Sequence, residues 1–122
     1  MPRIRILLVA ALAVLALTVV GTQASAAKVK GTLAGNVGPG FTITLKQKGK
    51  AVKTLKAGVY RINVSDNSGS HNFHLFGPGV NKKTGVASSG GATWTVKLKK
   101  GSYTYQCDIH FASGMIGHFK VK

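Results

Sequence analysis

From Lys28 onward, apolar and polar side chains alternate with a period of two, in short runs separated by turns. The clearest runs are FTITLKQ (residues 41–47), VYRINV (residues 59–64) and TWTVKL (residues 93–98). This alternation is typical of strands that bury one face and expose the other. A helix would repeat every 3.6 residues, and no segment after Lys28 has a convincing helical stripe. The chain is therefore constrained to build its core from sheets.

The parity of the alternation predicts which side chains face this core. The expected inward set is Phe41, Ile43, Leu45, Tyr60, Ile62, Val64, Trp94, Val96 and Leu98. The glycine-containing segments QKGK, SDNSGS and KKGS supply turns between the runs, and residues 80–92 are expected to form a long polar loop. Short strands at this spacing predict an all-β fold, a Greek-key β-sandwich or barrel of about seven to eight strands.

The first 26 residues differ from the rest of the chain. A basic start precedes the apolar run Ile6–Val20, and small residues follow it up to the A-x-A motif at Ala24–Ala26. These features are typical of a secretory signal peptide. We therefore expect residues 1–26 to be a cleaved signal peptide and residues 27–122 to form one exported domain, periplasmic or secreted. An uncleaved membrane anchor is the alternative, although the apolar run is short for a membrane span.

The charge of the chain is strongly unbalanced. The sequence has 17 Lys plus Arg against two Asp plus Glu, and loss of Arg3 and Arg5 with the signal peptide lowers the formal net charge from +15 to +13. A field of this size attracts anionic partners, such as an acidic protein or an anionic envelope surface. The competing explanation is a solvated surface that keeps a small protein soluble.

The segment CDIHFASGM (residues 107–115) contains the only cysteine and the only methionine after the initiator. It connects two expected strands, so Cys107, His110 and Met115 are expected at one end of the sandwich. Taken singly, each has a simpler explanation, as a small buried side chain, a surface histidine or core filler. Together, a thiolate, an imidazole and a thioether suit a copper site for electron transfer, provided that a second histidine joins them.

The segment GSHNFHLFGPG offers two candidates for the second histidine. His71 has the same parity as Phe73 and Leu75, whereas His74 has the opposite parity. If Phe73 and Leu75 face the core, His71 points towards the site and His74 points to solvent. His71 is therefore the preferred ligand, and His74, expected at an exposed polar position, is the alternative.

The segments SHNFHLFGPG and GSYTYQCDIHFASGM resemble those of the cupredoxins, the blue copper proteins, and particularly the plastocyanin-like group. In that family the first ligand is a histidine followed by asparagine. The other ligands lie in a loop of the form Cys-x-x-His-x-x-x-x-Met. The pair His71-Asn72 matches the first element, and Cys107, His110 and Met115 match the second.

The resemblance implies one type 1 copper ion, which cycles between Cu(I) and Cu(II). His71, Cys107 and His110 would form a trigonal plane around it, and Met115 would be a weak axial ligand. Asn72 would hold the Cys107 segment by hydrogen bonding, and such outer contacts tune metal sites. The chain departs from the family pattern in having Ser70 and Ile109 where proline often precedes each ligand histidine.

An apolar collar is expected around the exposed edge of His110, where an electron would pass to a docked partner. The expected collar residues are Phe76, Pro78 and Phe111. Small and transient interfaces suit such encounters.

These observations predict an exported type 1 copper protein that carries single electrons between redox partners. One alternative is an envelope protein that holds or delivers copper without redox turnover, and another is a basic β-domain that binds anionic polymers. We expect an acidic redox protein as partner, no specific nucleic acid and a monomer. We do not expect an enzyme, because the only acids are Asp66, in a turn, and Asp108, beside Cys107.

Overall fold

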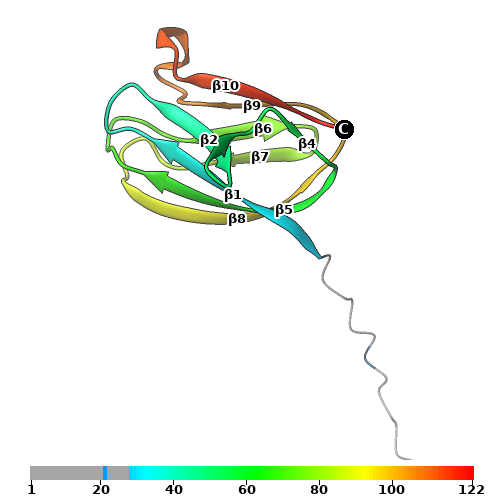
Figure 1. The fold of residues 1–122 in the computed structure, drawn as a ribbon. Coiled ribbons are helices and arrows are strands. Elements are labelled where there is room, and N and C mark those ends of the chain that lie inside the picture. The colour runs from blue at the N-terminus through cyan, green and yellow to red at the C-terminus, as the bar shows by residue number, and fades with distance from the viewer. Residues whose placement is uncertain (1–20, 22–27) are drawn as a thin grey trace, which may run out of the picture.

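Two five-stranded sheets pack face to face in the computed structural model, which describes Gly21 and residues 28–122 (Figure 1). The strands are β1 (Val29–Val37), β2 (Ile43–Gln47), β3 (Lys50–Ala51), β4 (Thr54–Leu55), β5 (Gly58–Asp66), β6 (His74–Gly77), β7 (Val80–Lys83), β8 (Gly90–Leu98), β9 (Gly101–Gln106) and β10 (Ile116–Val121). One turn of 3₁₀ helix, η1 (Phe111–Ser113), interrupts the last connection. The expected signal peptide, residues 1–26, lies outside the continuous described segment.

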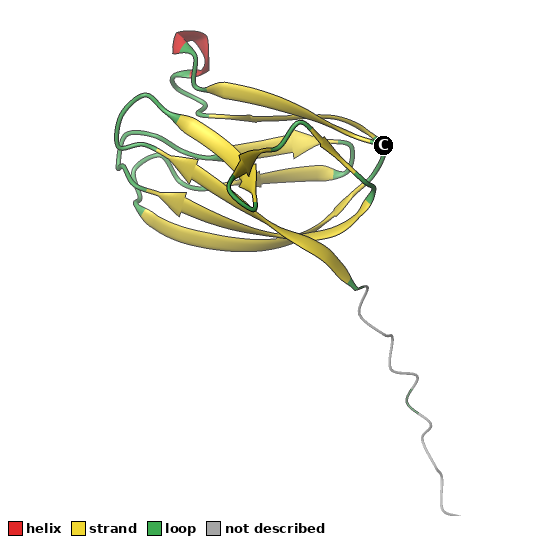
Figure 2. Ribbon diagram, in the orientation of Figure 1, coloured by secondary structure: helices red, strands yellow, loops and turns green. Residues whose placement is uncertain are grey.

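The strand order is β3-β2-β1-β5-β8 in the first sheet and β4-β10-β9-β6-β7 in the second. Strands β1 and β5 pair in parallel, as do β10 and β4, and the other pairs are antiparallel. The predicted all-β sandwich is therefore confirmed, and almost all regular structure is strand (Figure 2). Two more strands are present than expected because β3 and β4 have only two residues each, too few to show an alternation.

The core lies between the sheets and follows the predicted parity in most strands. In β5, Tyr60, Ile62 and Val64 are buried while the residues between them are exposed. The exception is Phe41, which is 62% exposed. Strand β2 begins only at Ile43, so Phe41 lies in the preceding loop and is not held in the sheet.

The expected loop over residues 80–92 is shorter than predicted. Strand β7 occupies residues 80–83 and β8 begins at Gly90, which leaves residues 84–89 as the connection. Lys82 and Lys83 on β7 are both exposed, so this edge strand has no alternation that the sequence could reveal.

The strand directions divide the connections between two ends of the sandwich. At one end, named here the Cys107 end, lie the loops 38–42, 67–73, 84–89 and 107–115. At the other, named the Lys99 end, lie the turns at 56–57, 78–79 and 99–100, whereas the turn at 48–49 lies along the side, because Lys46 pairs with Ala34 near the middle of β1. In Figure 1, η1 marks the Cys107 end, and the C-terminus and the start of β1 lie at the Lys99 end. Among the described residues, no helix has the length and hydropathy needed to cross a bilayer.

Candidate metal centre

Three potential ligands meet at the Cys107 end. His71 lies in the loop between β5 and β6, Cys107 follows β9, and His110 immediately precedes η1. The Sγ atom of Cys107 lies 3.8 Å from Nδ1 of His71 and 3.7 Å from Nδ1 of His110, and the two Nδ1 atoms are 2.9 Å apart. The structure therefore brings together a thiol and two imidazoles from segments far apart in the sequence.

The geometry and chemistry of this cluster fit a single metal ion. Two ligand atoms that bind one ion at about 2.0–2.3 Å lie roughly 3–4 Å apart, which is the spacing of these three atoms. Cys107 and His71 are buried, at 0% and 3% exposure, so water has little access to the lone pairs that converge there. A set of two imidazoles and one thiolate suits copper better than the hard cations, which prefer oxygen ligands.

Met115 closes the loop that carries Cys107 and His110. The backbone N–H of Cys107 donates to the carbonyl of Met115 at 3.0 Å, and the N–H of Met115 donates to the carbonyl of His110 at 3.3 Å. Gly114 turns the chain between them with a φ of 93°, a conformation that favours glycine. The side chain of Met115 is fully buried.

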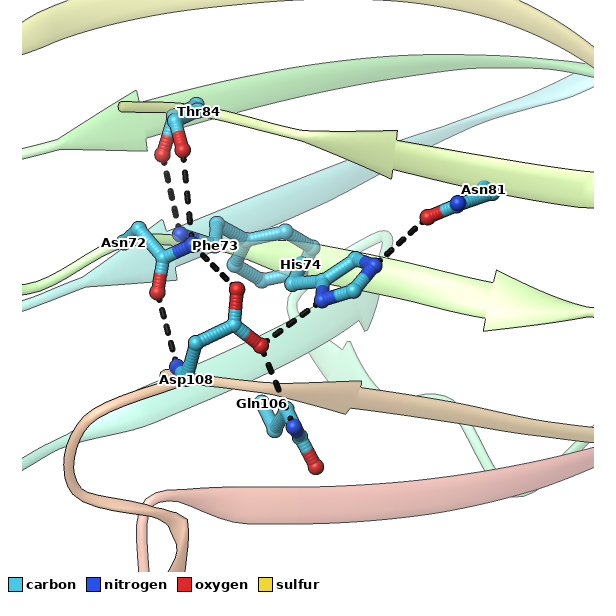
Figure 3. A network of polar contacts seen from close by, with 7 residues as sticks. All are labelled: Asn72, Phe73, His74, Asn81, Thr84, Gln106 and Asp108. Carbon is cyan, nitrogen blue, oxygen red and sulfur yellow. Dashed lines mark hydrogen bonds and ion pairs between the residues drawn. The ribbon is translucent and has the colours of Figure 1, made fainter. Parts of the chain in front are cut away.

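Asn72 connects two of the loops at this end (Figure 3). Its side-chain oxygen accepts a hydrogen bond of 2.8 Å from the backbone N–H of Asp108, and its amide nitrogen donates to the Asp108 carboxylate at 2.9 Å. The same nitrogen donates to the carbonyl of Thr84 at 3.3 Å. Asn72 thus holds the residue that follows Cys107, as the resemblance implied.

A second acid fixes the neighbouring loop. The hydroxyl of Thr84 donates to the Asp66 carboxylate at 2.7 Å and accepts from the backbone N–H of Phe73 at 2.9 Å. The sequence predicted Asp66 in a turn. In the structure Asp66 is 3% exposed and ends β5, so it is part of the buried framework. The two acids of the chain therefore both brace the loops around His71 and Cys107.

His74 lies outside the cluster and belongs to this network. Its Nδ1 contacts the Asp108 carboxylate at 2.7 Å and its Nε2 contacts the side-chain oxygen of Asn81 at 2.6 Å (Figure 3). The expected outward direction is therefore correct, but the expected free, exposed position is wrong. Burial favours a higher pKa for Asp108, but hydrogen bonds from His74, Asn72 and Gln106 outweigh it and hold the pKa below its ordinary value.

Two of the three expected collar residues lie elsewhere. Phe76 is on β6, beside His74, with ring centroids 4.9 Å apart on the outer face of the sheet. Pro78 lies at the Lys99 end, where its carbonyl accepts a hydrogen bond from the Tyr103 hydroxyl. The four residues of β6 carry the chain away from the cluster. Phe76 and Pro78 are therefore not near the cluster, although they follow His71 closely in the sequence. Phe111, by contrast, directly follows His110 and is 47% exposed.

Phe41 takes the place that the sequence assigned to Phe76 and Pro78. Its ring centroid lies 4.7 Å from that of His110 and 5.2 Å from that of His71, with edge-to-face geometry in both pairs. Ile109 and Ile116 add exposed apolar surface at the same end, at 55% and 37% exposure. The sequence signal for a loop here was the Gly38–Gly40 segment just before Phe41, but the alternation in FTITLKQ concealed it.

Comparisons of sequence alone place the chain with no relative. No protein-family model matches it, and no curated protein matches it.

Solved structures of similar fold include a copper protein. A structure described as that of the copper protein rusticyanin superimposes with a TM-score of 0.57 at 21% identity, over 75% of this chain and 76% of that chain. Auracyanin B gives a TM-score of 0.50 at 18% identity, over 84% and 96% of the two chains. Reduced auracyanin from the photosynthetic bacterium Roseiflexus castenholzii gives 0.52 at 17% identity, over 78% and 99%. The fold is therefore the cupredoxin fold, and the His-Cys-His-Met set lies where it fits a type 1 site.

Proposed function

We propose that this chain is an exported type 1 copper protein that carries single electrons between redox partners. The observation that carries the proposal is the convergence of Nδ1 of His71 and Nδ1 of His110 on Sγ of Cys107, in a loop that the buried Met115 closes. The rusticyanin and auracyanin structures of the same fold support it, since rusticyanin is described as a copper protein.

When bound, copper would supply a one-electron couple between Cu(I) and Cu(II). His71, Cys107 and His110 would hold it, with Met115 as a weak fourth ligand. Soft sulfur favours Cu(I) and imidazole binds both oxidation states. This mixed ligand set would therefore hold Cu(I) and Cu(II) with little change of geometry. The thiol of Cys107 binds metal as the thiolate, and its proton leaves when the cation arrives.

The contribution of the protein is to keep these side chains in place. The Asn72–Asp108 bonds and the Thr84–Asp66 bond fix the loops that carry the ligands, so the donor atoms need not rearrange when the charge changes. Apolar surface from Phe41, Ile109 and Phe111 surrounds the partly exposed His110. An uncharged and apolar rim of this kind suits brief contacts with a partner.

Export and the partner belong to the proposal as well. The basic start, apolar run and A-x-A motif of residues 1–26 support a cleaved signal peptide and a periplasmic or secreted protein. The net charge supports an acidic redox protein as partner, with which association would be fast at low salt.

The test is a titration of the purified protein with Cu(II), followed by visible absorption and electrochemistry. We expect one equivalent to produce an intense blue thiolate-to-copper band and a reversible one-electron wave. Cys107→Ser is expected to lose the band while the fold, followed by circular dichroism, remains. A colourless wild-type protein would refute the proposal. Tight copper binding with no reversible wave would instead favour the copper-holding alternative.

A further inference from the structure

The loops of the Cys107 end carry no lysine or arginine. None occurs in its four loops, residues 38–42, 67–73, 84–89 and 107–115. The composition gave no indication of this gap, because the loops become neighbours only through the strand order. The positive charge of the protein is therefore displaced from the end that carries the cluster.

The positive charge gathers at the Lys99 end. The lysines there are Lys28, Lys30, Lys53, Lys56, Lys97, Lys99, Lys100, Lys120 and Lys122, and all are exposed. The strand register holds them at one end of both sheets, since Lys97 pairs with Val59 at the start of β5 and Lys120 pairs with Thr54 on β4. The remaining cationic residues, along the sides, are Lys46, Lys48, Lys50, Arg61, Lys82 and Lys83.

Side-chain carboxylates do not balance this charge. The only two acids of the sequence, Asp66 and Asp108, lie at the Cys107 end and are bonded within the protein. A surface hollow of about 340 Å³ lies beside this end and is lined in part by Lys48, Lys50 and Lys53. An anionic group that entered it would meet several ammonium groups at once.

The charge at the Lys99 end is too far from the cluster to guide a redox partner directly to His110. Strand β9 separates Gly101 at the Lys99 end from Cys107, and its six residues span about 20 Å at roughly 3.3 Å per residue. A partner held only at the Lys99 end would be remote from His110. The lysines at this end add to the long-range attraction of an acidic partner, but they are also available to bind a second ligand, separate from the redox partner that docks at the cluster.

We propose that the Lys99 end binds the surface of an anionic phospholipid bilayer, which leaves the Cys107 end facing away from the membrane and open to the redox partner. Each lysine close to such a surface strengthens binding by about fivefold. The proposal goes beyond electron carriage and does not require copper, since none of the lysines is a ligand.

A lipid surface fits this end better than a nucleic acid does. The cationic groups at the Lys99 end are all lysines, which act as point charges and lack the planar fork with which arginine recognises single phosphates. The exposed aromatic residues Phe41 and Phe111, which could stack on bases, lie at the opposite end.

The chain connectivity points to the same surface. The continuous described segment starts with Lys28 at the Lys99 end. Only residues 21–27 separate it from the apolar run Ile6–Val20, a span of at most about 25 Å when extended. The segment that engages a membrane during the proposed export is thus joined to the lysine-rich end.

The test uses residues 28–122, which contain every described strand and the whole core. The matched auracyanin chain is covered over 99% of its length by this part of the fold, so a domain of this extent stands as a chain by itself. Binding is measured by co-sedimentation with vesicles of phosphatidylcholine and phosphatidylglycerol at a 3:1 ratio, and with vesicles of phosphatidylcholine alone. We expect binding to the first vesicles only, equally with and without copper.

Two variants with the same net charge locate the binding surface. The first changes Lys53, Lys97, Lys99 and Lys100 to glutamine, and the second changes Lys46, Arg61, Lys82 and Lys83 to glutamine. We expect the first to weaken binding to the anionic vesicles at least tenfold and the second to weaken it less than threefold. Circular dichroism checks that both variants fold.

Three results would overturn the proposal: equal weakening by the two variants, equal binding to neutral vesicles, or no binding to either kind of vesicle. A parallel measurement with heparin, a soluble anionic polymer, identifies the competing ligand. If heparin binds at a salt concentration that releases the vesicles, an anionic polymer replaces the bilayer as the partner. Because copper is not involved, failure of the copper titration would leave this result unaffected.

Discussion

His71 and His110 offer the same atom to Cys107 but differ in their contact with solvent. His71 is 3% exposed and anchors the cluster from the loop between β5 and β6. His110 is only partly buried and lies beneath the exposed ring of Phe41. At the scale of single residues, His71 is therefore a fixed support, and His110 provides the shortest route between the cluster and the surface.

The first prediction separates the two histidines of the HNFH segment. His71→Ala should abolish the blue band, because it removes one of the three converging ligand atoms. His74→Ala should keep the band, since His74 contacts Asp108 and Asn81 and does not reach the cluster. Visible absorption after addition of one equivalent of Cu(II) measures both. A band in the His71 variant together with its loss in the His74 variant would reverse the assignment.

The second prediction concerns Met115. Met115→Leu should retain the blue band and raise the reduction potential, because the long axial bond tunes the site and the apolar replacement disfavours Cu(II). The buried position accepts leucine, which has a similar volume. Cyclic voltammetry gives the potential. Complete loss of copper binding would show that Met115 is a primary ligand.

Residue-level prediction succeeded where parity was sufficient and failed where the chain leaves a strand. His71, Phe73 and Leu75 are all buried, as their shared parity indicated. Phe41 and Pro78 were misplaced, because a period of two cannot reveal where a strand begins or to which end its next turn leads. Those facts depend on pairing between distant strands, which no local pattern encodes.

The connecting loops of the Cys107 end behave as one element, because buried polar groups join them. Asn72 binds the Asp108 segment and the Thr84 carbonyl, and Thr84 in turn binds Asp66. A buried network of this kind is stable only when every member is satisfied. Among the described residues, no buried side-chain nitrogen or oxygen atom lacks a partner.

The third prediction tests this network through Asn72, which is 1% exposed. Asn72→Ala should lower the free energy of unfolding by about 2–4 kcal/mol, because it leaves the N–H of Asp108 and the carbonyl of Thr84 without partners. Urea denaturation of the copper-free protein measures the change. The control is Asn81→Ala, which removes a contact of His74 at an exposed position and should cost less than about 1 kcal/mol. Equal losses would contradict a special role for Asn72.

At the level of elements, the sequence predicted the strands and the ligand loop but not how the loops are joined. The Cys-x-x-His-x-x-x-x-Met spacing identified residues 107–115 as one unit. Thr84 gave no signal, because its partners Asp66 and Phe73 are distant in sequence and meet it only in the folded protein. The short strands β3 and β4 were also hidden, since their pairing partners define them.

The whole molecule is electrically one-sided. The lysines occupy the Lys99 end and the sides, while apolar residues and the cluster occupy the Cys107 end. Composition alone predicted a large positive field but suggested general solvation, because the lysines are spread along the sequence. Only the strand order shows that four separate loops without lysine meet at one end.

The fourth prediction follows from this separation. For the copper-loaded protein, the rate of reaction with a small anionic oxidant should fall with salt much less than the formal net charge implies. The reason is that charges about 20 Å from His110 lie beyond the screening length of about 10 Å at 0.1 M ionic strength. Stopped-flow absorption over a range of ionic strength gives the slope.

The two charge variants provide the internal comparison for this measurement. Neutralising Lys46, Arg61, Lys82 and Lys83 should reduce the slope, because Lys83 pairs with His74 near the Cys107 end. Neutralising Lys53, Lys97, Lys99 and Lys100 should leave the slope almost unchanged. If only the variant at the Lys99 end reduced the slope, the oxidant would be sensing the charge at that end, and the prediction would be wrong.

The use of both acids inside the network also limits what two copies of this protein can do with each other. Asp66 and Asp108 are bonded within the fold, so a second copy with the same lysines finds no free side-chain carboxylate among the described residues to pair with. Like-charged copies repel each other, so copies bound to the same surface would stay apart. Such a population would spread out as separate molecules, each available to a partner that brings its own negative charge.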